Sequence, residues 1–192
     1  MKIIGLTGGI GSGKSTVLSF FKEFDIPVYI SDIEAKKIMN VSEEVINKII
    51  FLFGKEAYVG GVLDRKYIAE IVFADIVKLK ELNAIVHPVV HKDFIQFVKK
   101  QNTPYLIYES ALLFENKTER QFDKVILVTA PLELRIQRLL KRDQSSLSDI
   151  KARIKNQLTD KDKIKKADFV LVNTEMSATK EEVHRLHKIF LE

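Results

Sequence analysis

Eight residues near the N-terminus have the types and the spacing of a phosphate-binding loop. Gly8, Gly13, Lys14 and Ser15 occupy the fixed positions of the pattern Gly-x-x-x-x-Gly-Lys-Ser. Glycines let the backbone turn so that successive N–H groups point at one phosphate, and a helix beginning near Lys14 would add its positive end. In such a loop Lys14 bridges the β- and γ-phosphates of ATP, and the Ser15 hydroxyl binds Mg²⁺. The residues predicted to contact the nucleotide are Gly11, Ser12, Gly13, Lys14, Ser15 and Thr16.

These glycines do not form the fingerprint of a dinucleotide-binding protein, which is Gly-x-Gly-x-x-Gly. A match starting at Gly9 would need glycine in place of Lys14, and a match starting at Gly11 would need it in place of Thr16. A GTPase is disfavoured for another reason, because the chain contains no Asp-x-x-Gly tetrapeptide. The pattern therefore favours a kinase that acts on a small molecule.

A kinase needs cations near the transferring phosphoryl group and covers that keep water from the reaction. Arg135, Arg138 and Arg142 are three and four residues apart on a predicted helix, so they share one face. The helix leads into the polar segment Asp143–Ser148, which is a candidate cover together with residues 32–101. Arg138 and Arg142 are the predicted catalytic cations, and the alternative for this face is a solvated basic surface.

Short apolar runs alternate with helical patterns along the chain. This alternation predicts an α/β fold with a five-stranded parallel sheet covered on both faces, as in the P-loop NTPases. Ser146 followed by Asp149 predicts a helix N-cap in the polar segment. The expected strands are Lys2–Leu6, Val28–Ile30, Tyr105–Tyr108, Val125–Val128 and Phe169–Val172, and the expected helices between and after them cover 15–23, 131–142 and 179–191.

Residues 32–101 are too long to be a simple crossover between the second and third strands. Their pattern is almost wholly helical, with one break at Gly54–Gly61 and another at Pro88. We expect this segment to be a helical substrate-binding insertion in a single domain. The expected parts are a core of residues 1–31 and 102–192, the insertion at 32–101 and a lid around 138–158.

The net charge of +5 and the pI of about 9.2 suit an acidic partner, either nucleotides or nucleic acid. No zinc-finger spacing and no pattern of aromatic and basic residues indicates nucleic-acid binding. The lysines at 161, 163, 165 and 166 are predicted to lie on a solvated helix face. The chain has no cysteine, no apolar run of 18 residues and no segment typical of a signal peptide. A cytoplasmic protein with neither a membrane segment nor an obligate protein partner is therefore expected.

Seven ordered motifs, which span nearly the whole chain, resemble those of the dephospho-CoA kinase family. The resemblance implies transfer of a phosphoryl group from ATP, with Mg²⁺, to the ribose 3′-hydroxyl of dephospho-CoA, which is the last step of coenzyme A synthesis. The open alternatives are another nucleoside or nucleotide kinase and a nucleic-acid-binding ATPase. The motifs are Leu6–Thr16, Gly61–Arg65 followed by Phe73, Leu82–Pro88, Leu112–Glu115, Gln137–Asp143, Arg153–Gln157 and Ala167–Asn173.

Asp32 follows the second predicted strand, at the edge where open α/β sheets bind their ligands. A carboxylate there can accept the proton of an attacking hydroxyl, and the resemblance implies the same role. The alternative is that Ser31 or Asp32 caps the next helix. Ile30-Ser31-Asp32 keeps only the second carboxylate of the Asp-Ala-Asp that the family often has, and Glu109-Ser-Ala111 stands in place of its usual Asp-x-Pro.

The remaining predicted site residues are named by their place in these motifs. Glu109 ends the third strand, where an acid would hold Mg²⁺ through water. Asn173 ends the last strand, and the resemblance places it beside the adenine of ATP, whereas a turn-forming Asn is the alternative. His87 is predicted to be a helix cap or a substrate contact, while His184 and His187 are expected at the surface. The residues predicted to contact the acceptor substrate are Thr7, Asp32, Arg65, His87, Glu109 and Leu112.

Overall fold

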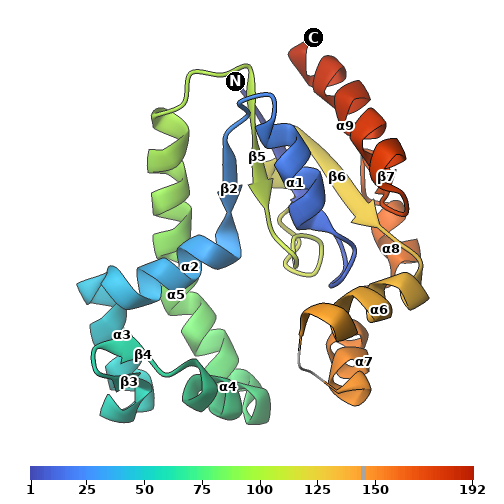
Figure 1. Ribbon diagram of the computed structural model, residues 1–192. Coiled ribbons are helices and arrows are strands. Elements are labelled where there is room, and N and C mark those ends of the chain that lie inside the picture. The colour runs from blue at the N-terminus through green and yellow to red at the C-terminus, as the bar shows by residue number, and fades with distance from the viewer. Residues whose placement is uncertain (144–145) are drawn as a thin grey trace. The chain divides into compact units, whose positions relative to one another are not determined.

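The chain is described by a computed structural model that covers residues 1–143 and 146–192 (Figure 1). It divides into two compact units, which we call the sheet unit (residues 1–29 and 102–192) and the helical unit (residues 30–101). The elements are β1 (Lys2–Thr7), α1 (Lys14–Lys22), β2 (Val28–Ile30), α2 (Ser31–Val41), α3 (Glu43–Phe53), η1 (Lys55–Ala57), β3 (Tyr58–Val59), β4 (Val62–Leu63), α4 (Arg65–Ala74), α5 (Ile76–Lys99), β5 (Tyr105–Glu109), η2 (Glu119–Gln121), β6 (Lys124–Thr129), α6 (Leu132–Arg142), α7 (Leu147–Lys155), α8 (Asp160–Ile164), β7 (Phe169–Val172) and α9 (Met176–Leu191).

The main sheet has five strands in the order β2-β5-β1-β6-β7. Strand β1 is the central strand and pairs in parallel with both β5 and β6, so that Leu6 lies opposite Glu109 on one side and Ile126 on the other. Most side chains of β1, β5 and β6 are buried, as expected of strands whose two faces are both covered. The predicted five-stranded parallel sheet is confirmed.

Helices α1 and α9 pack against each other in the sheet unit, and α1 lies in front of the sheet in Figure 1. The ring of His187 on α9 stacks on Phe24 at a centroid distance of 4.1 Å. Its Nδ1 lies 2.7 Å from the hydroxyl oxygen of Tyr105, which is fully buried. His187 is half-buried because these two aromatic side chains cover part of its ring, so the expectation that it lies at the surface holds only in part. His184 is exposed, as expected.

The helical unit contains four helices and one short hairpin, β3-β4, among its residues 30–101. The hairpin and η1 fill the predicted break at Gly54–Gly61, and three glycines there have positive φ. Two aspartates cap the next helices, because the side chain of Asp64 accepts hydrogen bonds from two N–H groups at the start of α4, and Asp75 does the same for α5.

The predicted break at Pro88 is wrong. Helix α5 runs without interruption from Ile76 to Lys99 and contains Pro88. Proline removes one helical hydrogen bond at a cost of about 3 kcal/mol, which the rest of a long, packed helix can offset. Val86, Val90 and Phe94 are buried at four-residue spacing, and α5 packs on α2, α3 and α4. This burial keeps the helix continuous through the proline.

The polar segment after α6 leads into a helix whose start is confirmed. Ser146 and Asp149 form a reciprocal capping box at the N-terminus of α7. Residues 144 and 145 of the predicted lid lie outside the described residues. Lys161, Lys165 and Lys166 are exposed as expected, although only Lys161 lies on a helix, since α8 ends at Ile164. The expectation is wrong for Lys163, which is fully buried beside Glu115. In the part of the chain that the structure describes, no helix is long and apolar enough to cross a membrane.

Candidate active site

The phosphate loop joins the carboxyl end of the central strand β1 to the N-terminus of α1. Gly11 and Gly13 have φ of 80° and 91°, which favour glycine. A Cβ atom at Gly11 would lie 2.7 Å from the carbonyl oxygen of Arg135, and one at Gly13 would overlap Nδ2 of Asn173. Both glycines are therefore required by the backbone and by the neighbouring side chains. The loop and the first turn of α1 present main-chain N–H groups of the kind that bind phosphate.

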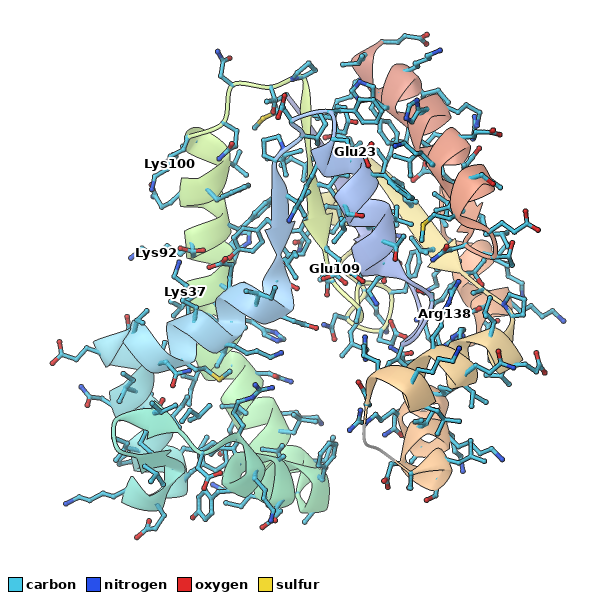
Figure 2. The ribbon with its side chains drawn as sticks, viewed as in Figure 1. Glu23, Lys37, Lys92, Lys100, Glu109 and Arg138 are labelled. Carbon is cyan, nitrogen blue, oxygen red and sulfur yellow. The ribbon has the colours of Figure 1, made fainter. Side chains whose placement is uncertain are left out.

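Lys14 is the first residue of α1, and its ammonium group lies between a carbonyl and a carboxylate. Nζ donates a hydrogen bond of 3.1 Å to the carbonyl oxygen of Gly8 and lies 3.7 Å from Oε1 of Glu109. Glu109, which is labelled in Figure 2, is the last residue of β5. It is 6% exposed. The structure thus brings together the cation and the acid that the sequence analysis assigned to phosphate and to Mg²⁺, while the Ser15 hydroxyl is exposed on the second residue of α1.

Two buried hydroxyl groups at this loop have no protein partner among the described residues. They are Oγ1 of Thr7, which ends β1, and Oγ of Ser12. Buried polar atoms are normally hydrogen-bonded, so such atoms beside a loop of N–H groups fit a polar ligand. Together with Lys14, these hydroxyls make the loop chemically suited to a polyphosphate with its metal ion.

Asn173 supports the phosphate loop from the end of β7. Its Nδ2 donates a hydrogen bond of 2.9 Å to the carbonyl oxygen of Ser12. Its Oδ1 accepts one of 3.0 Å from the hydroxyl of Thr179, and both residues are buried. The side-chain amide is therefore already engaged within the protein. The contact with adenine stays a prediction, and this bracing of Ser12 is a role that the sequence analysis missed.

The three arginines of α6 have different surroundings. Arg135 is buried, and its Nε donates to the carbonyl oxygen of Ile10 at 2.9 Å. Arg138 donates from Nη1 to the carbonyl oxygen of Ser12 at 3.3 Å. The side chain of Arg142 is 64% exposed and donates from Nε to Asp143 at 2.8 Å. This hydrogen bond raises the pKa of Arg142 and holds the pKa of Asp143 below its usual value. A solvated basic face is therefore wrong for Arg135.

Three predicted substrate residues belong to the helical unit and are exposed. Asp32 is the second residue of α2, where its charge complements the positive helix end. The N-cap is Ile30 and no side chain caps this helix, so the alternative that Asp32 or Ser31 is the cap is wrong. Arg65 begins α4, and His87 lies inside α5, so His87 is not a helix cap.

Leu112 lies in the loop that follows β5 in the sheet unit, and 42% of its surface is exposed. Turn hydrogen bonds hold this loop. The carbonyl oxygen of Leu112 accepts one from the N–H of Asn116 at 2.9 Å, and that of Leu113 accepts one from the N–H of Thr118 at 3.1 Å. Leu113 and Phe114 are buried below it. The loop thus presents Leu112 to solvent from a packed base.

The sequence model of the dephospho-CoA kinase family matches residues 2–179, which include the phosphate loop, the helical unit and β7. The chain belongs to the dephospho-CoA kinase family. It is therefore a phosphotransferase, and kinases of this family take the phosphoryl group from ATP. The predicted family is confirmed.

Individual members of the family are similar in sequence to this chain over most of their length. The dephospho-CoA kinase of Bacteroides fragilis is 38% identical over 171 residues, which are 88% of this chain and 83% of that protein. The enzyme of Idiomarina loihiensis is 32% identical over 191 residues, or 98% and 95% of the two chains. A crystal structure of a Thermus thermophilus protein is 36% identical, with a TM-score of 0.92, over 100% of this chain and 98% of that one.

A solved dephospho-CoA kinase from Campylobacter jejuni is 28% identical, covers 97% of this chain and 95% of its own, and has a TM-score of 0.71. The fold is shared more widely. A shikimate kinase from Acinetobacter baumannii is similar over 100% of this chain and 93% of its own with a TM-score of 0.52, but only 18% of its residues are identical. The likeness to that enzyme concerns the fold alone.

Proposed function

We propose that this enzyme transfers the γ-phosphate of ATP, bound with Mg²⁺, to the ribose 3′-hydroxyl of dephospho-CoA. The products are ADP and coenzyme A, and the reaction is the last step of coenzyme A synthesis. The observation that carries the proposal is the family match over residues 2–179, which runs through both units and not only through the phosphate loop.

The phosphate loop binds the triphosphate in this proposal. The N–H groups at the start of α1 bind the β-phosphate, and Lys14 contacts the β- and γ-phosphates. The Ser15 hydroxyl would be a ligand of Mg²⁺, and Glu109 would hold the metal through water. The metal, when bound, neutralises charge that develops on the phosphate oxygens. The pairing of Lys14 with Glu109 supports this assignment, because it places the cation and the acid together beside the loop.

The helical unit binds the acceptor in this proposal. Asp32 accepts the proton of the attacking 3′-hydroxyl. Its exposure on the first turn of α2 supports this role, since its carboxylate does not cap the helix. Arg65 and His87 contact remote parts of dephospho-CoA. Such contacts raise the rate by holding the reacting hydroxyl in line with the γ-phosphate. On the sheet unit, the residues proposed to contact the acceptor are Thr7, Glu109 and Leu112.

Arg138 and Arg142 of α6 supply positive charge at the transferring phosphoryl group. Arg138 is the stronger candidate because it already contacts Ser12 in the phosphate loop. Arg142 is more exposed and is held by Asp143. A guanidinium group is planar and can donate two parallel hydrogen bonds to the oxygens of the phosphoryl group that is transferred.

The test is ADP release by the purified enzyme in Mg·ATP, measured with and without dephospho-CoA. We expect release to depend on dephospho-CoA, with coenzyme A formed in equal amount. Lys14→Ala is the control, and it should be folded and almost inactive. Release that needs no dephospho-CoA, or that DNA or RNA stimulates, would contradict the proposal and favour a different P-loop protein.

A further inference from the structure

Both main-chain polar groups of Ile10, in the phosphate loop, are bound by side chains from elsewhere in the sheet unit. Its carbonyl oxygen accepts a hydrogen bond of 2.9 Å from Nε of Arg135. Its N–H donates one of 2.9 Å to Oε1 of Gln157. Arg135 lies on α6, whereas Gln157 follows the C-terminus of α7. The two peptide groups that flank Ile10 are thus held from outside the loop.

Gln157 has a defined position of its own. Its N–H donates to the carbonyl oxygen of Ile154 at 3.1 Å, in the last turn of α7. The next residue, Leu158, donates its N–H to Oε1 of Glu115 at 3.0 Å. The same carboxylate oxygen lies 2.8 Å from Nζ of Lys163, which is fully buried. A buried ion pair therefore anchors the connection between α7 and α8, and this connection carries Gln157 to the loop.

The same connection also reaches the other side of Ile10. Asp160, the first residue of α8, lies 3.3 Å from Nη1 of Arg135 through each of its carboxylate oxygens. Its Oδ2 also accepts a hydrogen bond of 2.6 Å from the hydroxyl of Thr129, at the end of β6. The carbonyl side and the N–H side of Ile10 thus both depend on residues 157–160.

The direction of these peptide groups matters for phosphate binding. Main-chain N–H groups bind phosphate only when the loop dihedral angles point them at it, and electrostatic stabilisation depends on their being in place before the reaction. Gly11 follows Ile10 and has a φ of 80°. A rotation of the peptide between Ile10 and Gly11 would turn the N–H group of Gly11 to a new direction, and glycine offers little resistance to such a rotation.

We propose that Gln157 is a positioning residue for phosphoryl transfer. It accepts the hydrogen bond of the Ile10 N–H and holds the phosphate loop in the conformation that binds the triphosphate. Gln157 lies two residues after the end of α7, the helix predicted to be part of the lid, so it couples the position of that helix to the conformation of the loop. The proposal rests on the kinase function proposed above.

The first variant is Gln157→Leu, which keeps the volume of the side chain and removes the acceptor. An N–H that loses its partner weakens the conformation it supported, and the usual size of this loss corresponds to about a tenfold change in affinity. We expect the KM for ATP to rise about tenfold and kcat to fall, while the KM for dephospho-CoA changes by less than about twofold. Gln121→Leu, at an exposed glutamine of η2, is the matched control.

The second variant is Gln157→Glu, which keeps an acceptor for Ile10 but adds negative charge near the phosphates. Salt screens the repulsion between charges, and the screening length falls from about 10 Å at 0.1 M salt to about 3 Å at 1 M. The KM for ATP of Gln157→Glu should therefore approach that of the parent enzyme when both are measured in about 0.5 M KCl. Gln157→Leu should gain nothing from salt, because it lacks an acceptor and not a charge.

Two results would overturn the proposal. One is a folded Gln157→Leu enzyme whose KM for ATP and kcat are both within about twofold of the parent values, even if its unfolding temperature is lower. The other is a KM for ATP that rises equally in Gln157→Leu and Gln157→Glu, both at low salt and in about 0.5 M KCl. Calorimetry with Mg·ADP alone repeats the comparison without an acceptor. A parent that binds ADP but does not phosphorylate dephospho-CoA would therefore reject the proposed function while still testing Gln157.

Discussion

Arg138 and Asn173 are joined through the main chain of Asn173. Nη2 of Arg138 donates a hydrogen bond of 3.0 Å to the carbonyl oxygen of Asn173, while Nη1 donates one of 3.3 Å to the carbonyl oxygen of Ser12. The side chain of Asn173 donates to the same oxygen of Ser12. One guanidinium group thus ties the end of β7 to the phosphate loop.

This geometry predicts that Arg138→Lys loses activity although it keeps the positive charge. An ammonium group cannot donate in two fixed parallel directions, so it would lose one of the two carbonyl contacts and the bidentate contact proposed for phosphate. We expect kcat to fall about tenfold or more. Steady-state kinetics of Arg138→Lys and Arg142→Lys, side by side, give the measurement. Full activity in Arg138→Lys would count against its role, and full activity in both would leave the two residues as surface charge.

Asp32→Asn should lower kcat by about 10²–10⁴, the usual effect of removing a positioned general base. The side chain is exposed and caps no helix, so the fold should be unaffected. Binding of dephospho-CoA should change much less than kcat. Steady-state kinetics and calorimetry measure the two quantities separately. Lost binding together with a normal rate at saturation would move Asp32 from catalysis to substrate recognition.

Lys163→Met should destabilise the protein. Lys163 is fully buried, and its ammonium lies 2.8 Å from Glu115, whose side chain is only 15% exposed. Removing one partner leaves the other charge unpaired in a poorly solvated place, which costs about 3 kcal/mol. The measurement is the free energy of unfolding in urea. Adding Glu115→Gln should recover part of the loss, and a single variant as stable as the parent would show that the pair contributes nothing.

Stability should fall as the pH drops below about 6.5, the usual pKa of histidine. Burial lowers the pKa of His187 below that value, and the neighbouring His184 lowers it further. The unfolded chain therefore binds a proton at a higher pH than the folded chain, so the contribution of His187 is complete above about 6.5 and is lost as the pH falls through the lowered value. Urea unfolding at several pH values measures this effect. His187→Gln should show a weaker pH dependence, and an unchanged dependence would exclude His187 as its source.

The parts of this molecule that the sequence predicted are those that depend on neighbours along the chain. The phosphate loop follows from glycines and a lysine within eight residues, and the five strands follow from short apolar runs. The capping box of Ser146 and Asp149 is another such local feature. Each of these is decided by backbone conformation or by local burial, so a single window of sequence contains the cause.

The parts that the sequence did not predict depend on partners far along the chain. Nothing near Lys163 indicates that Glu115 will pair with it, 48 positions earlier, and nothing near Gln157 indicates its bond to Ile10. Pro88 is the opposite case. Its local effect is to break a helix, and the packing of the other turns of α5 outweighs that effect.

The central claim is tested most directly by the specificity constant, kcat/KM, for dephospho-CoA compared with those for adenosine and AMP in the same Mg·ATP. The helical unit is too large to serve only as a crossover between strands, and contacts with the remote parts of dephospho-CoA should raise kcat as well as affinity. We therefore predict a far larger constant for dephospho-CoA, with adenosine turned over slowly even at saturation. Equal or larger constants for adenosine or AMP would contradict the account and indicate a nucleoside or nucleotide kinase.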